Sequence, residues 1–172
     1  GKADGNESQH PTPVLMRGVG GNGTLGGGVD IAAGAAHTML LIGNKTMWIV
    51  GDNTEKQLGV DTTKDGNTYT ATIVEVDLPV DANSSTGDKV EAAALSAGPY
   101  NSAFMTADGR AFVWGNNQYY QVLNDAAGEK VSLVSQLNQP NETSGIVALQ
   151  FGGSRSTQTP IAALTDSGKV YN

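Results

Sequence analysis

The chain contains no cysteine, which excludes disulfide bonds and thiolate chemistry but does not identify the compartment. Aromatic residues make up only 6% of the 172 residues and charged residues only 16%, whereas there are 23 glycines. This composition favours a turn-rich β protein over a helical bundle. No long apolar run is present, so the sequence predicts no transmembrane helix. No basic and then apolar segment opens the chain, so we expect any secretion signal to have been removed or never included.

Basic residues are also scarce. Ten Lys and Arg residues stand against seventeen Asp and Glu residues, for a formal net charge of −7. Affinity for nucleic acids depends on Lys and Arg side chains that neutralise phosphates, and the ten basic residues form no stripe. The sequence therefore predicts no nucleic-acid partner and no insertion into a membrane. The two histidines, His10 and His37, cannot build a three-ligand zinc site without carboxylates, and no HxxE or HExxH pattern occurs.

The low charge and the abundance of glycine, threonine and asparagine favour a secreted bacterial protein, located outside the cell or on its surface. Asn-x-Ser/Thr sequons occur at Asn6, Asn22, Asn44, Asn83 and Asn141. They would be glycan candidates in a secreted eukaryotic protein. A chain this rich in asparagine, serine and threonine also produces sequons by chance, so both interpretations stay open.

An internal repeat organises the chain. The stretch from Val29 to Gly59 returns at Val90 to Leu123, and a partial third copy begins at Ile146. From Gly34 over Gly98 to Leu58 over Val122 the first two copies align at a shift of 64 residues without a gap. Each copy has the pattern strand, tight turn, strand, tight turn. In the second copy, Asp108-Gly109 predicts a two-residue hairpin turn, because these residues supply the positive φ angles that such a turn requires.

Repeats of this kind predict an all-β fold. A single hairpin is not stable in water, so the copies must stack and bury one another's apolar faces, as the blades of a β-propeller do. The expected divisions are a repeat tail (1–28), a repeat (29–89), a second repeat (90–144) and a partial repeat (145–172). About three blades make an incomplete ring, since propellers close with about four to eight. We therefore expect the chain to be part of a longer propeller or of a ring that several chains complete, with open blade edges that invite self-assembly.

Several motif elements recur in a fixed order. In the first copy they are Val29-x-Ile31-Ala32-Ala33-Gly34-x-x-His37-Thr38, Trp48, Gly51-x-Asn53 and Gln57-Leu58-Gly59, and in the second Asp108-Gly109-Arg110-Ala111-Phe112-Val113-Trp114-Gly115-x-Asn117. This order resembles the repeat of the regulator of chromosome condensation family, in a divergent, bacterial-type form. The departures are Val50, where the family usually has Trp, Asn101 in place of His, and Leu123 in place of the last Gly.

The resemblance implies a propeller that binds proteins. The sequence itself offers no catalytic residues and no residues for a cofactor or a metal. The founding member of the family looks like a guanine nucleotide exchange factor that acts on a small GTPase, and bacterial relatives include secreted propellers that inhibit β-lactamases. Beside a protein-interaction scaffold, two alternatives stay open. One is a structural subunit of an extracellular or surface assembly, and the other is a secreted enzyme-inhibitor-type or GTPase-regulator-type propeller.

Three motifs imitate functional sites. Gly18 to Gly23 fits G-x-G-x-x-G, but a predicted strand follows where a dinucleotide site needs a helix, so we interpret the stretch as a connection between blades. Asp61 to Asn67 resembles a calcium loop but has Thr63 at the third position and no flanking helices, which favours a solvated hairpin loop. His37 is interpreted as a hydrogen-bonding spacer within a blade.

Aromatic residues suggest one contact site. Tyr119 and Tyr120 follow the turn at Gly115-Asn116-Asn117, and an aromatic pair beside a turn is typical of a protein-contact anchor. Packing of this loop against the next blade is the alternative explanation. Trp48 and Trp114 are expected in the core of their blades.

Overall fold

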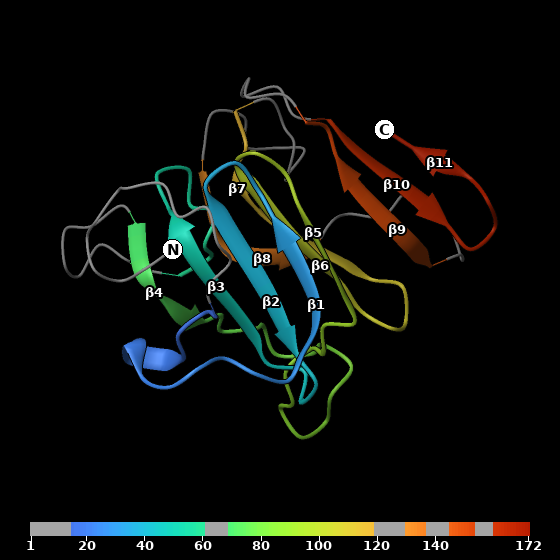
Figure 1. The fold of residues 1–172 in the computed structure, drawn as a ribbon. Helices are drawn as coiled ribbons and strands as arrows, with labels where there is room; N and C mark the ends of the chain where they lie inside the picture. Colours follow the sequence, from blue (N-terminus) through green and yellow to red (C-terminus); the bar gives the residue numbers. More distant parts are fainter. Residues whose placement is uncertain (1–14, 61–68, 119–129, 137–144, 154–159) are drawn as a thin grey trace.

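The computed structural model describes residues 15–60, 69–118, 130–136, 145–153 and 160–172 (Figure 1). In these residues the fold is all-β, with one short 3₁₀-helix, η1 (Val19–Gly21), and no α-helix. No helix among them has the length and apolar character needed to cross a membrane. The predicted fold class is therefore confirmed.

Three antiparallel sheets follow one another along the chain, and we call them blades 1, 2 and 3. Blade 1 contains β1 (Gly28–Ala33), β2 (His37–Ile42), β3 (Met47–Asp52) and β4 (Tyr69–Glu75), in that spatial order. Blade 2 contains β5 (Ala94–Ala97), β6 (Asn101–Met105), β7 (Ala111–Asn116) and β8 (Lys130–Gln136). Blade 3 contains β9 (Ile146–Phe151), β10 (Ile161–Thr165) and β11 (Val170–Tyr171), in the spatial order β11-β10-β9.

The hairpin turn of blade 2 differs from the prediction. The N–H of Thr106 donates to the carbonyl oxygen of Arg110 at 2.9 Å, and the N–H of Gly109 donates to that of Thr106 at 3.1 Å. Three residues therefore form the loop where two were predicted, and within it only Gly109 has a positive φ, of 83°. This is the three-residue hairpin whose last loop residue is left-handed. Gly168 takes the same place in blade 3, and Lys45, with a φ of 69°, takes it in blade 1.

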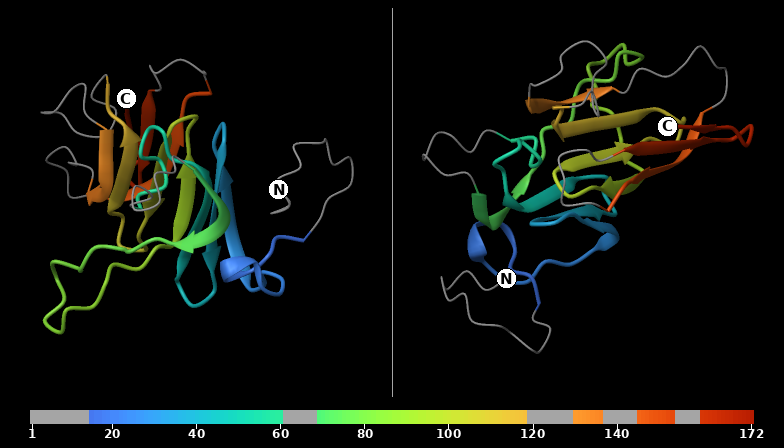
Figure 2. Two further views of the ribbon diagram at one scale, coloured as in Figure 1. Left: turned by 90° about the vertical axis from the view of Figure 1, so that its left-hand side faces the viewer. Right: turned by 90° about the horizontal axis from the view of Figure 1, so that it is seen from above.

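The sheets lie face to face (Figure 2), with β1 beside β5 and β5 beside β9. Side chains alternate between the two faces of a strand, so each blade has a trailing face toward the next blade and a leading face toward the preceding one. The core lies between the blades and includes Met39 and Ile49 from blade 1. The rings of Phe104 and Phe112 stack there, with centroids 4.7 Å apart.

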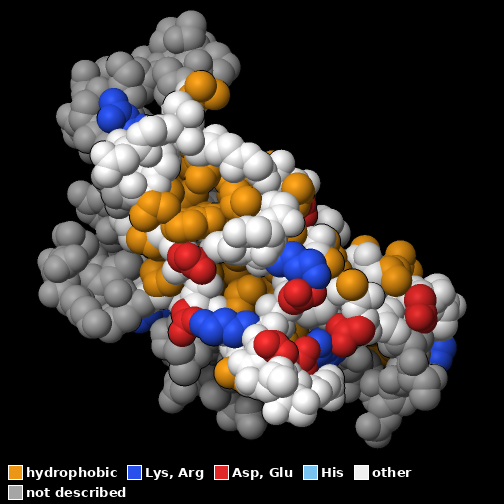
Figure 3. Space-filling view, turned by 90° about the horizontal axis from the view of Figure 1, so that it is seen from below, with side chains coloured by type: hydrophobic (Ala, Val, Ile, Leu, Met, Phe, Trp, Pro, Cys, Tyr) orange, Lys and Arg blue, Asp and Glu red, His pale blue; other side chains and the backbone are white. Residues whose placement is uncertain are grey.

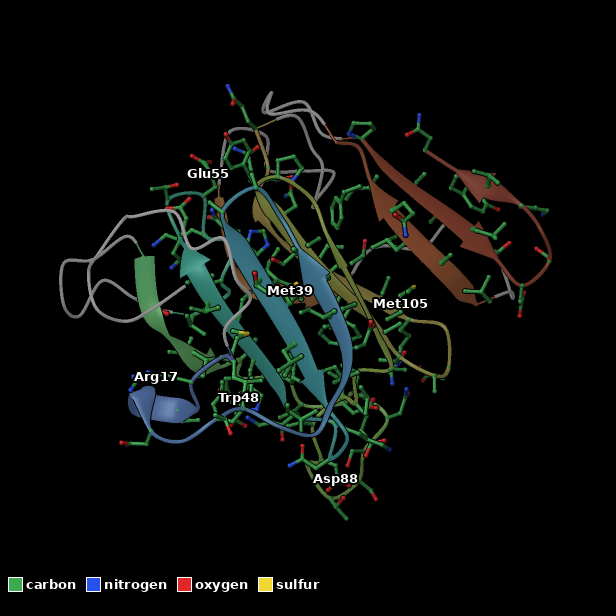
Figure 4. All side chains as sticks on the ribbon, in the orientation of Figure 1. Arg17, Met39, Trp48, Glu55, Asp88 and Met105 are labelled. Atoms are coloured by element: carbon green, nitrogen blue, oxygen red, sulfur yellow. The ribbon has the colours of Figure 1, made fainter. Side chains whose placement is uncertain are left out.

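The two tryptophans have different surroundings. Trp114 is fully buried between blades 1 and 2, as expected for a core residue. Trp48 lies on β3 at the position that Phe112 has in blade 2, and it is partly exposed on the leading face of blade 1 (Figure 4). The expectation that both lie in the blade core therefore holds in full for Trp114 alone.

Candidate interaction surfaces

One loop contains both the Gly-x-Asn and the Gln-Leu-Gly elements of the repeat. Asn53 is buried, and its side-chain oxygen accepts the N–H of Leu58 at 2.9 Å while its side-chain nitrogen donates to the carbonyl oxygen of Val60 at 3.1 Å. The side-chain nitrogen of Gln57 donates to a carboxylate oxygen of Asp52 at 2.6 Å. These contacts satisfy polar groups that the loop buries, and so fix its shape.

The same loop also contacts the next blade. The carbonyl oxygen of Gln57 accepts hydrogen bonds from Nε1 of Trp114 at 2.8 Å and from Oγ of Ser102 at 2.7 Å, both of blade 2. Gly59 lies against the indole with a φ of 64°, and a Cβ there would come within 2.8 Å of Nε1. Glycine is thus required both for its backbone conformation and for room. The Gln-Leu-Gly element of one blade therefore binds the tryptophan of the following blade.

His37 joins the same junction. Its Nε2 lies 2.8 Å from Oγ of Ser102. Because Ser102 donates its own proton to the carbonyl oxygen of Gln57, the hydroxyl accepts from Nε2–H of the imidazole. Burial lowers the pKa of His37 to about 4, although the nearby Asp52 charge acts in the opposite direction. His37 is thus a hydrogen-bonding spacer, but it connects two blades, whereas the sequence analysis placed that role within one blade.

The His37–Ser102 pair has no nucleophilic role in this arrangement. Ser102 is fully buried, its proton is directed to a backbone carbonyl, and Nδ1 of His37 has no hydrogen-bond partner in the described structure. A catalytic serine needs a base that accepts its proton and an orienting group on the other imidazole nitrogen. The pair therefore stabilises the blade junction.

A polar cleft of about 560 Å³ lies between the turn of blade 2 and the connection from β4 to β5. Figure 3 views this lower end, where acidic and basic side chains gather. The connection folds on itself through hydrogen bonds from Thr86 and Ser84 to the carboxylate of Asp88. These bonds lower the pKa of that carboxyl. Asp88 marks this end in Figure 4, and Glu55 marks the opposite end.

Arg110 connects the two walls of the cleft. Its guanidinium donates two hydrogen bonds to the carboxylate of Asp81, at 2.9 and 2.8 Å, and a third to Asp108 at 2.9 Å. These bonds hold the pKa of both carboxyls below the usual range, and they raise the pKa of Arg110. Paired, bidentate bonds of this kind fix geometry as well as charge. The cleft is therefore a preformed polar surface that can contact a protein segment.

The described residues at this end form no metal site. No three His, Cys, Asp or Glu side chains come together there, or elsewhere in the described ranges, in a way that could hold a metal ion. Sequence reasoning missed this cleft because Asp81 and Arg110 are 29 residues apart and only the fold brings them together. It also missed the role of Gln57, for which the recurrence of Gln-Leu as Gln121-Val122 was the available signal.

The remaining sequence-predicted sites have separate outcomes. Tyr119 and Tyr120, the proposed contact pair, lie outside the described residues, as does the loop from Asp61 to Asn67. Gly18 to Gly23 forms the single 3₁₀ turn η1, and β1 follows it, so no helix offers its N-terminus to a pyrophosphate. This stretch is a connection, as expected.

The chain shares its repeat with known proteins. Residues 92–121 match the family described as the regulator of chromosome condensation (RCC1) repeat. The regulator of chromosome condensation of Xenopus laevis is 31% identical over 149 residues, which cover 74% of this chain and 32% of that protein. The human X-linked retinitis pigmentosa GTPase regulator is 33% identical over 91 residues, covering 53% of this chain and 8% of that protein. The chain thus spans about a third or less of the length of these relatives.

A solved structure shows the same fold. Yeast RCC1 (Prp20), solved with Kap60 bound to it, superposes with a TM-score of 0.62 at 18% identity, over 84% of this chain and 31% of that one. At this level of identity the likeness concerns the fold alone. The sheets described above therefore have the arrangement of RCC1 propeller blades.

Proposed function

This chain is an RCC1-like repeat protein, and from that premise we propose that it is a non-catalytic protein-interaction module. It acts as a propeller scaffold that presents loops to another protein. Names among its relatives support a protein partner, since one relative is called a GTPase regulator and the yeast structure contains Kap60. Fold alone does not determine function, so the proposal depends on how this chain uses its residues.

One observation carries the proposal: the buried polar side chains and the close-packed glycine of the repeat motif are occupied in folding one loop and in joining two blades. Asn53 folds the loop, Gln57 and Gly59 receive Trp114, and His37 binds Ser102. Residues that hold a scaffold together are not available to a ligand. Recognition is therefore assigned to segments that do not repeat, as is usual for loops on a rigid framework.

Among the described residues, the connection from Leu78 to Val90 is the segment that best fits this role. It is exposed along most of its length, and it forms one wall of the cleft. The bond between Asp81 and Arg110 ties it to blade 2, so a partner would meet a preformed surface at low entropic cost.

The experiment compares two variants in direct binding to a small GTPase and to Kap60. In the first variant, residues 82–87 are replaced by a Gly-Ser segment of equal length, which keeps Asp81, Asp88 and Arg110. We expect its dissociation constant for the partner to rise at least about tenfold, or about 1.4 kcal/mol. The matched control is Glu55→Gln, which lies at the opposite end of the molecule and keeps an acceptor for Asn116. Equal binding by the parent chain and the loop variant would contradict the proposal.

A GTPase-regulator-type propeller is the second candidate, and the name of the human relative favours it. The two candidates differ in outcome, because a regulator of nucleotide exchange accelerates nucleotide release from the GTPase, whereas a scaffold binds without changing that rate. Release of a fluorescent nucleotide, measured with and without the chain, separates them. The extracellular or cell-surface location stays a prediction from composition, to be checked by fractionating cells that express the chain.

A further inference from the structure

We propose that the polar cleft between the turn of blade 2 and the connection from Leu78 to Val90 binds an extended segment of the partner protein that carries lysine or arginine side chains. The proposal rests on the proposed function and deepens it, since it names the chemistry that this connection recognises. Three properties of the cleft support it: the charge of its lining, the way its own cations are already paired, and its small apolar surface.

The lining of the cleft is acidic. It contains four carboxylates and two cations, which give it a local net charge of −2, and these are Asp81, Asp88, Glu91 and Asp108 against Lys89 and Arg110. Figure 3 shows acidic and basic side chains gathered at this end of the molecule. The whole chain has a formal charge of −7, so its field adds to that of the cleft. A cationic segment is therefore attracted to this surface.

Both cations of the lining are already paired within the chain. Arg110 donates hydrogen bonds to Asp81 and Asp108, and Lys89 forms an ion pair with Asp77, which lies outside the lining. The side chain of Arg110 is also only 17% exposed. An anionic ligand would have to displace carboxylates of the chain itself before it met an unpaired cation. The cleft therefore disfavours phosphate or an acidic peptide as its occupant.

Asp88 is a carboxylate without a cationic partner. Among the residues that the structure describes, no Lys or Arg side chain forms an ion pair with it. The hydroxyls of Thr86 and Ser84 donate to its Oδ2 and lower the pKa of this carboxyl, so it stays ionised at neutral pH. Asp88 is exposed on a connection that projects beyond the sheets (Figure 2). A cation of a partner can thus supply the counter-charge to a carboxylate that is already held in place.

The opposite wall offers a second carboxylate. Asp108 in the turn of blade 2 accepts hydrogen bonds from Arg110 and Thr106, which hold the pKa of its carboxyl below the usual range. Its side chain remains 54% exposed, and the two oxygens of an ionised carboxylate have about four acceptor positions in all. Asp88 and Asp108 therefore allow neighbouring basic side chains of one segment to bind both walls of the cleft.

The lining has little apolar surface. Ala107 is the only hydrophobic residue in the described lining, which contains no aromatic side chain. Sites for small organic ligands are lined mainly by hydrophobic and aromatic side chains, with only a few polar groups. A cleft of about 560 Å³ lined by carboxylates, hydroxyls and an amide instead fits long polar side chains. The occupant is therefore a hydrophilic stretch of protein.

The first test is the binding of a fluorescein-labelled peptide of repeated Gly-Ser-Lys units to the full chain, measured by fluorescence anisotropy. We expect saturable binding that weakens as salt is added, and no binding of the corresponding Gly-Ser-Glu peptide. Asp88→Asn should raise the dissociation constant about threefold, because it removes one charge but keeps an oxygen that accepts from the hydroxyls of Ser84 and Thr86.

The matched control for Asp88→Asn is Glu55→Gln. It removes the same charge at the opposite end of the molecule, and the dissociation constant of the lysine peptide should not change. Equal effects of the two variants would show attraction to the overall charge of the chain and would overturn the proposal. Failure of the lysine peptide to bind the parent chain would overturn it as well.

Carbodiimide cross-linking locates the bound peptide. The reagent joins a lysine amine to a carboxylate that it contacts, so a lysine peptide acetylated at its N-terminus should become attached to Asp88 or Asp108. Mass spectrometry of the digested product identifies the carboxylate, and Asp88→Asn should lose the attachment at that position. Attachment mainly at carboxylates outside the cleft, such as Glu55, contradicts the proposal.

A charge reversal separates this proposal from the proposed function. Asp88→Lys places a cation in the cleft and should raise the dissociation constant for the small GTPase or Kap60 at least about tenfold, while circular dichroism shows a folded chain. If the Gly-Ser loop variant loses the partner but Asp88→Lys binds it as the parent chain does, the cationic segment is wrong and the protein-interaction function stands. If both variants bind as well as the parent chain, both proposals fail.

Discussion

Blades 1 and 2 contain the same repeat but differ in the burial of its residues. Every side chain of β6 and β7 in blade 2 is buried, whereas β2 of blade 1 alternates between buried and half-buried. Leu40 of blade 1 is partly exposed where Phe104 of blade 2 is fully buried. The patterns of apolar residues are alike, so the difference comes from the neighbours, since among the described sheets only blade 2 lies between two others.

This difference shows that the same residue of the repeat can contribute different amounts to the free energy of unfolding in different blades. A side chain on the leading face contributes in proportion to the apolar area that the preceding blade removes from water. Substitutions at equivalent positions should therefore have unequal effects on stability in the two blades.

The largest effect is expected at the tryptophans. Trp114→Ala removes a fully buried indole and its hydrogen bond to Gln57, and should lower the free energy of unfolding by about 3 to 5 kcal/mol. Trp48→Ala, on the partly exposed face of blade 1, should cost less than about half as much. Urea denaturation followed by circular dichroism measures both. Equal losses would mean that the leading face of blade 1 is covered as well.

Acid should weaken the junction through His37. Burial lowers its pKa in the folded state to about 4 from 6.5, so between these values the unfolded chain binds a proton that the folded chain excludes. Stability is therefore complete above pH 6.5 and falls as the pH drops toward 4, by about 3 kcal/mol in all. The pKa values of the Asp81 and Asp108 carboxyls are also lowered, so the contribution of these groups to the stability of the folded chain is lost only at still lower pH.

The second copy of the repeat suggests a control variant for this titration. Blade 2 has Asn101 at the position of His37, where its side-chain nitrogen donates to the carbonyl oxygen of Asn116 at 2.6 Å. His37→Asn should therefore fold and lose most of the pH dependence between 6.5 and 4. The measurement is the urea midpoint across that range. An unchanged slope in the variant would assign the acid sensitivity to other groups.

A smaller effect is expected at the hydroxyl that joins the blades. Ser102→Ala leaves the buried Nε2–H of His37 without an acceptor and should cost about 1 to 3 kcal/mol. Thr38→Ala changes the equivalent residue on the leading face of blade 1, where Thr38 is half-buried, and should cost less than about 0.5 kcal/mol. Thermal unfolding of the pair provides the comparison, and a Thr38→Ala loss as large as that of Ser102→Ala would show that the blades do not differ here.

Sequence reasoning reached the fold because the repeat fixes it. The shift of 64 residues placed His37 over Asn101 and Asn44-Lys45 over Asp108-Gly109, and the registers reproduce both equivalences. The site was less accessible, because the motif residues prove to be structural. The bonds from Gln57 to Trp114 and from Asp81 to Arg110 join residues 57 and 29 positions apart, and neither pairing follows from spacing along the chain.

Turn chemistry was one element that sequence reasoning interpreted wrongly, and it provides the smallest test. Lys45 has a φ of 69° at the position where blades 2 and 3 have glycine. A side chain in this conformation is strained, and its exposed ion pair with Glu91 offsets little of the cost. Lys45→Gly should therefore raise the free energy of unfolding by about 0.5 to 1 kcal/mol, whereas Gly109→Lys in blade 2 should destabilise strongly, because a Cβ there would lie 2.4 Å from the Cα of Gly145. If Lys45→Gly lowers stability, then the ion pair outweighs the backbone strain, and the turn of blade 1 differs from its two equivalents in more than one residue.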